Sequence, residues 1–408
     1  MQGAFEPLAI SFPPPQLRGD ETPGRRAMKR YWTINGRFLT QPVTGVQRYG
    51  REILTALDGL VGDGHPLTDG LEIEVVAPRG ADAPALHHIP VRIAGRLGGH
   101  LWEQTELPMS IRGGLLSLCN TGPLAARRHI VCIHDLNPRA FPESYARSFR
   151  LLYSALLPML ARRAVQVVTV SEFSAGELAA FRMIAPGQAI VIPNGHEHAV
   201  AWESCASPPV LEHAAPNTIV LLGSLAPHKN ARLILDLSEE LRQAGLRIAV
   251  VGQSDPAVFA RAQVSDFGPN VAWLGRLSDG ELKALLEASL CLAFPSLQEG
   301  FGLPPLEAMA VGCPVLVSDR TSLPEVCGSA ALYASPAQPR DWLELLVALH
   351  RDPTLRARMS EQGRRRALEF SWRRSAEQYL EAFLAADQRS KRGSAQEPVP
   401  ASRRLAHP

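Results

Sequence analysis

The chain has 408 residues, of which 46% are hydrophobic and 20% are charged, and its formal net charge is +2. These values describe an ordinary globular protein that is long enough for two domains. Acidic and basic residues are interspersed along most of the chain, which argues against the one-signed field that a nucleic-acid-binding protein needs. We find no uninterrupted apolar run of about 18 residues, so we expect no transmembrane helix and a cytoplasmic location.

The sequence changes character at Met28. Residues 1–27 are rich in proline with scattered acidic residues, unlike a signal peptide, and we expect a disordered extension there. From residue 28 to about 202, short β-rich runs alternate with longer helical ones, which is the pattern of parallel βαβ units. The strands expected in this half are residues 31–35, 72–78, 91–95, 115–120, 129–135, 165–171 and 189–195.

The longest helix expected in this half spans about residues 144–163. Apolar residues recur in it at helical spacing, from Phe149 through Tyr153 and Leu156 to Leu160. The arginines around this stripe are Arg147, Arg150, Arg162 and Arg163. Two interpretations of them remain open: a solvated face, or a surface attracted to an anionic membrane, where each cation contributes about 1 kcal/mol.

A second run of alternating elements follows residues 203–216, a segment rich in Pro, Ser and Ala that we expect to be an interdomain linker. The strands expected after it are residues 218–224, 247–252, 271–275, 290–296 and 314–319. We therefore predict two doubly wound parallel-sheet domains in series, residues 28–202 and 217–369. Residues 370–386 are expected to form one more helix. The tail, residues 387–408, has no face to bury and is expected to be disordered.

The loop after the last-but-one of these strands reads "QEGFGLPPLEAM" (298–309) and combines glycines and prolines with two glutamates. Open parallel sheets bind ligands at the carboxyl ends of their strands, where such loops lead into helices. Gly300 and Gly302 remove side chains, so that backbone amides can approach a ligand, and the helix start that follows favours negative charge. The loop therefore suits a phosphate group or sugar hydroxyls.

The two glutamates of this loop, Glu299 and Glu307, are hydrogen-bond acceptors. Glu307, which we expect in the first helical turn, can bind the vicinal hydroxyls of a ribose, and Glu299 at the strand end can bind another polyol. Taken alone, such features are more often a favourable partner of a helix dipole or an ordinary turn. Their coincidence favours a nucleotide attached to a sugar.

The same segment resembles the signature of family 4 glycosyltransferases, in which seven residues separate two glutamates that stand where Glu299 and Glu307 stand here. The resemblance covers nearly all of residues 29–385 and implies an α/β protein of the GT-B fold, with two Rossmann-like domains facing a central cleft. It implies that the first domain, residues 28–202, lies on the acceptor side and that the second, residues 217–369, binds the nucleotide sugar. It also implies a retaining enzyme that moves a hexose, best identified as mannose, from a nucleoside diphosphate sugar. A saccharide or lipid-linked saccharide acceptor in polysaccharide biosynthesis is expected, and residues 370–386 become the helix that crosses back to the first domain.

The resemblance assigns roles to loop residues that, taken alone, would more often be a solvated lysine, a core histidine or a turn. Glu299 and His134 become the catalytic residues, each contacting the donor sugar from its own domain, and Asp135 is an orienting candidate. The residues expected to bind the donor are Gly45, Gly223, Ser224, Lys229, Gly300, Phe301, Gly302, Leu303 and Glu307. Many members carry arginine where this chain has Ser224, and this departure puts the strength of phosphate binding in doubt.

Neither a metal nor a cofactor is expected, because the chain has no Asp-any-Asp pair of the kind that holds a divalent ion in the other large transferase fold. Lys229 and the amides of residues 300–303 would stabilise the leaving diphosphate instead. The segment "LWEQTELP" (101–108) also resembles one found in members that act on mannose- or rhamnose-type donors. It receives no role from the sequence, and Trp102 within it is interpreted as a core residue.

Other functions remain as alternatives to the transferase. A nucleotide-sugar isomerase of the GT-B fold and a scaffold with weakened catalysis share the same architecture. An NAD-dependent oxidoreductase also uses tandem βαβ domains, but it needs a glycine-rich fingerprint after a first strand, and the loops "NGRFLTQPVTG" and "GSLAPHKN" provide none. No nucleic-acid partner is expected, whereas peripheral contact with the inner face of a membrane stays open.

Overall fold

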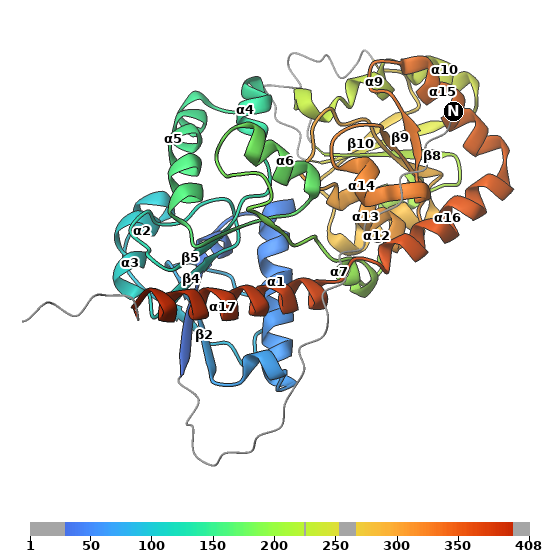
Figure 1. Cartoon of the computed structure of the whole chain (residues 1–408). Coiled ribbons are helices and arrows are strands. Elements are labelled where there is room, and N and C mark those ends of the chain that lie inside the picture. The colour runs from blue at the N-terminus through green and yellow to red at the C-terminus, as the bar shows by residue number, and fades with distance from the viewer. Residues whose placement is uncertain (1–28, 224–225, 253–266, 395–408) are drawn as a thin grey trace, which may run out of the picture.

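The computed structural model describes residues 29–223, 226–252 and 267–394. The chain forms two domains, each built on a parallel sheet, and they lie side by side (Figure 1). The expected N-terminal extension, residues 1–27, lies outside the described residues, as do Ser224 and residues 395–408. Among the described residues, no helix is long and apolar enough to cross a membrane.

The first sheet has seven parallel strands in the order β3-β2-β1-β4-β5-β6-β7. Its strands are β1 Arg30–Asn35, β2 Leu71–Ala77, β3 Val91–Ile93, β4 Gly114–Ser117, β5 His129–Cys132, β6 Gln166–Thr169 and β7 Ile190–Val191. All seven strands expected for this half are therefore present, most of them shorter than predicted. The chain runs outward from β1 to β3 and then returns to β4 on the other side of β1. This reversal creates a crevice at the carboxyl ends of β1 and β4.

The second sheet has six parallel strands in the order β10-β9-β8-β11-β12-β13. Its strands are β8 Thr218–Leu222, β9 Arg247–Val251, β10 Val271–Gly275, β11 Cys291–Phe294, β12 Val315–Ser318 and β13 Leu332–Ala334. Five of them were predicted, whereas the three-residue strand β13 was not. The same kind of reversal occurs between β8 and β11, so this domain repeats the architecture of the first.

Helices connect and cover the strands of both sheets (Figure 1). They are α1 Gly45–Gly62, α2 Gly99–Thr105, α3 Leu107–Ser110, α4 Asn137–Ala140, α5 Arg147–Arg163, α6 Glu172–Ala180, α7 Glu197–Ala201, α8 Pro208–His213, α9 Arg232–Leu235, α10 Ser238–Gln243, α12 Asp279–Ala288, α13 Leu303–Ala310, α14 Leu323–Cys327, α15 Pro339–Arg351, α16 Pro353–Ala367 and α17 Trp372–Ser394. Strands β5, β11 and β12 are buried along their whole length. That burial explains their continuous apolar sequences, because both faces of each sheet are covered.

Helix α17 crosses from the second domain back to the first, as expected, and runs along α1 (Figure 1). The hydroxyl of Tyr379 lies 2.9 Å from that of Tyr49 on α1, and Phe383 stacks on Trp32 with ring centroids 4.2 Å apart. Both contacts are buried, so the helix is an integral part of the first domain.

The predicted start of the disordered tail at residue 387 is wrong, because α17 continues to Ser394. The carboxylate of Asp387 is buried, accepts a hydrogen bond from Trp32 Nε1 at 3.2 Å and pairs with Arg128 at 2.9 Å. These long-range partners hold a segment whose own sequence shows no apolar face. Helix α8 likewise lies inside the expected linker, residues 203–216.

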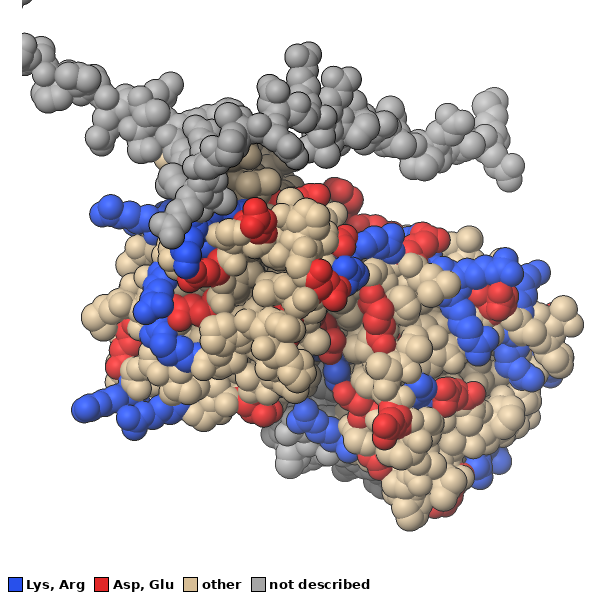
Figure 2. Space-filling model, turned by 90° about the horizontal axis from the view of Figure 1, so that it is seen from below, with Lys and Arg blue, Asp and Glu red and all other residues tan. Residues whose placement is uncertain are grey.

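Charges of both signs lie close together on the face shown in Figure 2. Some surface arginines pair with a glutamate of the same helix, such as Arg242 with Glu239 and Arg365 with Glu361, each at 2.8 Å. Such exposed pairs contribute little to stability. They do show that the small net charge of the sequence arises from intermixed charges.

Candidate active site

A cleft of about 330 Å³ lies between the two sheets, and it corresponds to the central cleft predicted from the sequence. The first domain contributes Gly45, His134 and Asp135 to its walls, and the second contributes Lys229, Glu299 and residues 300–304. These residues follow β1, β5, β8 and β11, which are strands at or near the two reversal points. The cleft therefore gathers loops that are far apart in sequence but share the carboxyl edges of the sheets.

The glycine loop of the second domain is held tightly against the first domain. A Cβ atom on Gly300 would lie 2.4 Å from the carbonyl oxygen of His134, so only glycine fits there. Ser171 and Ser174 donate hydrogen bonds to the Gly300 carbonyl, at 2.5 and 3.0 Å. Gly302 precedes α13 with a φ of 100°, a conformation that favours glycine, and the start of α13 lines the cleft.

Lys229 and Glu299 form an ion pair at the edge of the cleft. Lys229 Nζ donates to Glu299 Oε1 at 2.7 Å, and the two side chains are 24% and 10% exposed. The backbone carbonyl of Glu299 accepts a hydrogen bond from Ser322 at 3.1 Å, which fixes the loop. The pair rests on a single hydrogen bond, so both side chains are available to a ligand in the cleft.

His134 reaches the cleft from the first domain with a defined tautomer. Its Nε2 lies 2.7 Å from the carbonyl oxygen of Leu118, so Nε2 carries a proton and donates it to that carbonyl. Burial lowers the pKa of His134 to about 4, and the imidazole is therefore neutral near pH 7. Nδ1 has no hydrogen-bond partner among the described residues, and it is left as an acceptor. Tyr49 supports the ring edge-on, with centroids 4.7 Å apart.

Two further predicted residues, Asp135 and Gly45, lie in the same cleft. Asp135 Oδ1 accepts a hydrogen bond from the amide of Asn137 at 2.9 Å. Burial raises the pKa of Asp135, and the negative charge of Glu299 acts in the same direction. Gly45 is the first residue of α1, and Thr44 before it makes no side-chain bond to the first helical amides. A Cβ atom on Gly45 would meet nothing within 4 Å, so this helix start is open to the cleft.

The remaining predicted donor residues are Gly223, Phe301 and Leu303. Phe301 and Leu303 line the cleft together with the glycines between and before them. Gly223 follows β8 with a φ of 124°, and a Cβ atom on it would lie 3.9 Å from the aliphatic carbons of Lys229. Ser224 lies outside the described residues, so its replacement of the usual arginine has no structural description.

Glu307 is the predicted site residue that the structure places differently. We expected it in the first helical turn, but α13 begins at Leu303, which puts Glu307 in the second turn, and it does not line the cleft. It is 6% exposed, and its Oε1 accepts a hydrogen bond from His198 Nε2 at 2.9 Å. The expectation of the first turn is wrong because Gly302, and not a later residue, caps the helix.

Two residues around Glu307 escaped the sequence analysis. His198 accepts a hydrogen bond from Trp372 Nε1 at its Nδ1, so its Nε2 carries the proton donated to Glu307. Arg48 lies 3.7 Å from Glu307 and pairs with Asp279 across the domain boundary at 2.6 Å. Arg48 follows Gly45 by three residues and therefore lies on the same face of α1, so the spacing in the sequence could have indicated that Arg48 belongs to the site. In the part of the chain that the structure describes, no donor binds Glu307 Oε2.

Metal ligands are not gathered in this site. Among the described residues, no group of three or more His, Cys, Asp or Glu side chains could hold a metal ion. The charged groups of the cleft are instead one lysine and two carboxylates, surrounded by helix starts and glycine amides. Such a set matches a ligand that carries both phosphate and hydroxyl groups.

Comparison with known families gives two matches that together cover most of the chain. Residues 44–199 match the family model described as Glycosyltransferase Family 4, and residues 207–366 match the model described as Glycosyl transferases group 1. The boundary between the two matches falls where β7 has ended and α8 begins, which agrees with the two-sheet architecture.

Three known proteins illustrate the similarity. The chain is 28% identical to the O-antigen chain mannosyltransferase RfbU of Salmonella typhimurium over 56% of its own length and 62% of that protein. It is 32% identical to the MMP alpha-(1->4)-mannosyltransferase of Mycolicibacterium hassiacum over 71% of its length and 72% of that protein. The solved sucrose-phosphate synthase of Thermosynechococcus elongatus superposes with a TM-score of 0.65 at 16% identity, covering 90% of this chain and all of that one. The fold is therefore GT-B.

Proposed function

Because the chain belongs to glycosyltransferase family 4, we propose that it transfers a hexose, most simply mannose, from a nucleoside diphosphate sugar to a saccharide acceptor in polysaccharide biosynthesis. Both relatives above are named as mannosyltransferases, which supports the choice of sugar. The observation that carries the proposal is the convergence of Gly45, Lys229, Glu299 and the glycine loop on one cleft.

The donor would lie across the cleft with its diphosphate between the two helix starts. The open amides at the start of α1 and the charge of Lys229 offer donors for the phosphate oxygens. In the first turn of α13 only the amide of Leu303 can add to them, because Pro304 and Pro305 have no N–H. Lys229 would exchange its bond to Glu299 for one to the diphosphate, and this would free the carboxylate of Glu299 for the hydroxyls of the sugar. Glu307 lies outside the lining of the cleft, one helical turn beyond Leu303, and would offer Oε2 to a ribose hydroxyl while Oε1 stays bound to His198.

The reaction would proceed with retention and without a metal or other cofactor. Fixed donors aimed at the departing diphosphate stabilise the charge that develops there. The departing phosphate oxygen accepts the proton of the acceptor hydroxyl, and the new glycosidic bond forms on the same face of the sugar. Neutral His134 presents Nδ1 to a hydroxyl of the donor sugar. Asp135, which lines the same cleft, orients that hydroxyl. Closure of the cleft excludes water as a competing acceptor.

The first test measures donor binding and turnover. Thermal shifts with GDP, UDP and dTDP identify the base, because a ligand that binds only the folded state raises the melting temperature according to its affinity. Turnover of the matching nucleotide sugar should persist in EDTA. A chain that neither binds nor turns over any nucleotide sugar in a broad panel would contradict the proposal.

The acceptor is proposed to be lipid-linked and reached at the inner face of a membrane. A groove of about 510 Å³ between α4 and α5 is lined by Arg139, Arg147 and Arg150 together with Leu151. Leu151 is 74% exposed, and neither Arg147 nor Arg150 has an ion-pair partner in the described residues. Unpaired cations beside exposed apolar side chains suit an anionic lipid surface, where each cation contributes about 1 kcal/mol.

Vesicle flotation tests this contact on the full chain. Binding to vesicles containing phosphatidylglycerol should exceed binding to neutral vesicles and should fall with added salt. The double variant Arg147→Ala/Arg150→Ala should lose most of it, whereas Arg242→Ala/Arg365→Ala, which removes two surface arginines of the second domain, serves as the matched control. Equal binding of both vesicle types would mean that the groove is a solvated face.

A further inference from the structure

A second pocket of about 270 Å³ opens beside the donor cleft, entirely within the first domain. Its lining includes Arg37, Asn120 and Tyr153. The residues that it shares with the cleft are Thr44, Val46, Asp135 and Tyr145. The shared residues place the two cavities end to end. A group bound in the second pocket would therefore meet the donor along this shared boundary, where Asp135 is the charged residue.

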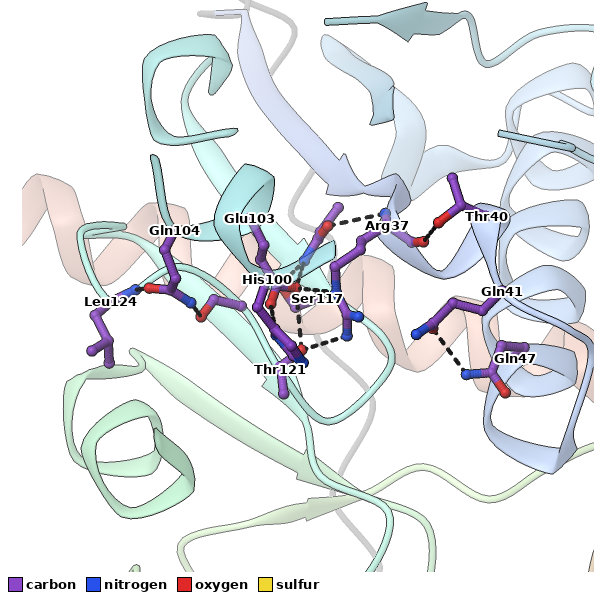
Figure 3. Close-up of polar contacts among 12 residues, drawn as sticks. Arg37, Thr40, Gln41, Gln47, His100, Glu103, Gln104, Ser117, Thr121 and Leu124 are labelled. Atoms are coloured by element: carbon purple, nitrogen blue, oxygen red, sulfur yellow. Dashed lines mark hydrogen bonds and ion pairs between the residues drawn. The ribbon is translucent and has the colours of Figure 1, made fainter. Parts of the chain in front are cut away.

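Arg37 lines this pocket. Figure 3 shows the network of polar contacts that holds it. Its Nε donates to Glu103 Oε1 at 3.0 Å, and its Nη2 donates to Thr121 Oγ1 at 2.7 Å. The Arg37 side chain is 7% exposed and that of Glu103 is fully buried. Glu103 also accepts hydrogen bonds from Asn35 at 2.7 Å and from His100 at 3.1 Å.

These bonds leave one nitrogen of the guanidinium unused. Nη1 of Arg37 has no hydrogen-bond partner within the described parts of the chain, although the residue is more than nine-tenths buried and lines the pocket. A guanidinium cannot lose its proton, so Nη1 retains two N–H donors for whatever occupies the pocket. The pocket therefore carries a fixed donor that no residue of the described chain uses.

The charge of the pocket argues against an anionic occupant. Burial alone would raise the pKa of Glu103, but its hydrogen bond to His100 and the charge of Arg37 lower it overall, so the carboxylate stays ionised. The Arg37–Glu103 pair is thus neutral as a unit, and Asp135 adds a carboxyl group at the end shared with the cleft. A phosphate or carboxylate would gain little from the paired arginine and would meet Asp135.

The wall of the pocket is aromatic. Tyr145 stacks on Phe149 with centroids 5.5 Å apart, and Phe149 stacks on Tyr153 with centroids 4.0 Å apart. His228 of the second domain stacks on Tyr145 in turn, so the rings lead from the donor cleft into the pocket. Because the rings stack on one another, most of their faces are covered, and they form a rigid apolar wall against which the C–H groups of a sugar can pack. Arg37 and Asn120, which also line the pocket, can bind the hydroxyls of that sugar.

We propose that this pocket binds an uncharged sugar unit of the acceptor, with Arg37 as its hydrogen-bond donor, the three stacked rings as its wall and Glu103 as the residue that positions Arg37. The proposal rests on the glycosyltransferase function and extends it to the acceptor. It also gives the segment 101–108 a structural task. Trp102 of that segment is fully buried, which confirms it as core, and Gln104 holds the 120–124 loop through Gly122 at 2.9 Å.

The test measures binding of methyl α-mannoside, methyl α-glucoside and methyl glucuronide to the full chain by saturation-transfer NMR. The wild-type chain should bind at least one uncharged methyl hexoside more tightly than the glucuronide. Arg37→Lys keeps the charge but loses the Nη1 donors, and Tyr153→Leu removes one ring of the wall. Each should weaken binding of the hexoside about tenfold or more, which corresponds to about 1.4 kcal/mol. Arg112→Lys, an exposed arginine of the same domain, is the control.

Glu103→Gln tests the positioning role by a readout that a general loss of structure would not produce. It leaves the charge of Arg37 uncompensated, so the preference should shift from the hexoside toward the glucuronide. Glu106→Gln, in the same segment but outside the pocket, should leave the preference unchanged. Binding of the glucuronide ahead of every hexoside by the wild-type chain, no hexoside binding at all, or wild-type binding by Arg37→Lys would overturn the proposal. The thermal shift with nucleoside diphosphates reports the donor site separately, so failure of the pocket and failure of the transferase function are distinguishable.

Discussion

The molecule contains two cation–carboxylate pairs at adjoining cavities, and they differ in how firmly they are held. Lys229 and Glu299 meet through one hydrogen bond at the edge of the donor cleft and are 24% and 10% exposed. Arg37 and Glu103 lie beneath the second pocket at 7% and 0% exposure. Besides its bond to Arg37, Glu103 forms three hydrogen bonds, with Asn35, His100 and Thr121.

The number of bonds that hold each pair determines what the pair can do. A pair that is joined by one hydrogen bond beside a cavity loses little free energy when it exchanges that bond for one to a ligand. A buried pair with several fixed partners cannot, because an unpaired charge in the interior is expensive. The first pair is therefore suited to binding and the second to holding a donor in place. The following variants separate these two tasks.

The largest effect is expected from Glu103→Leu. It removes the carboxylate and leaves the charge of Arg37 buried without compensation, which costs about 3–5 kcal/mol in the free energy of unfolding. Urea denaturation followed by circular dichroism measures this loss. Glu239→Gln, at the exposed pair with Arg242, is the control and should leave the urea midpoint unchanged. A loss of stability below about 1 kcal/mol for Glu103→Leu would mean that the Arg37–Glu103 pair is held no more firmly than the Lys229–Glu299 pair.

The next effect concerns catalysis alone. Glu299→Ala removes the proposed acceptor for the donor sugar and should lower kcat about 100- to 1000-fold, the size seen when a group aimed at the reacting centre is removed. The urea midpoint should hardly move, since the pair with Lys229 is partly exposed. Initial rates with the identified nucleotide sugar measure the decrease in kcat. Glu287→Ala on the exposed face of α12 is the control. Unchanged transfer would disprove the assignment of Glu299.

The pH dependence of stability should reveal buried histidines of the first domain. Burial lowers the pKa of His129 and of His134 to about 4, whereas a histidine in the unfolded chain titrates near about 6.5. As the pH falls from about 6.5 to about 4, the unfolded chain binds protons that the folded chain does not, so stability should decrease in that window. Melting temperatures between pH 7 and 5 measure the slope. His129→Gln should flatten it, and His87→Gln, at an exposed site, should not.

The smallest effect is expected at the contact between the domains. Ser174→Ala removes the hydrogen bonds to the carbonyls of Gly300 at 3.0 Å and His134 at 2.9 Å, but Ser171 still holds Gly300. We expect a loss of about 1 kcal/mol in stability and a decrease of less than tenfold in kcat/KM. Adding Ser171→Ala should enlarge both effects. No change in the double variant would show that the glycine loop needs no clamp from the first domain.

The architecture and the members of the donor cleft were accessible from the sequence for a common reason. Buried parallel strands appear as continuous apolar runs, and ligand-binding loops follow them directly. Lys229, Glu299 and His134 each stand at such a strand end, and the structure brings them into one cleft. Their catalytic and binding roles remain proposals that the variants above test.

Other features were mispredicted or missed where the deciding partner was remote. Asp387 extends α17 because Trp32 and Arg128, more than 250 residues earlier in the chain, bind its carboxylate. Glu307 is turned toward His198, and Gly302 sets the helix start that places it there. No local pattern reports the contacts of Asp387 with Trp32 and of Glu307 with His198, whereas the helix start at Gly302 is a local feature.

The sequence by itself determined the two parallel-sheet domains, the loops that end their central strands and the resemblance that identifies the family, because these depend on local periodicity and short motifs. Only the tertiary structure decided which charges are free to bind and which are fixed. Arg37 and Glu103 are separated by 66 residues and look like any charged pair in the sequence. Their burial in one network is what turns the first into a fixed donor and the second into its support, because a buried charge must keep its partner.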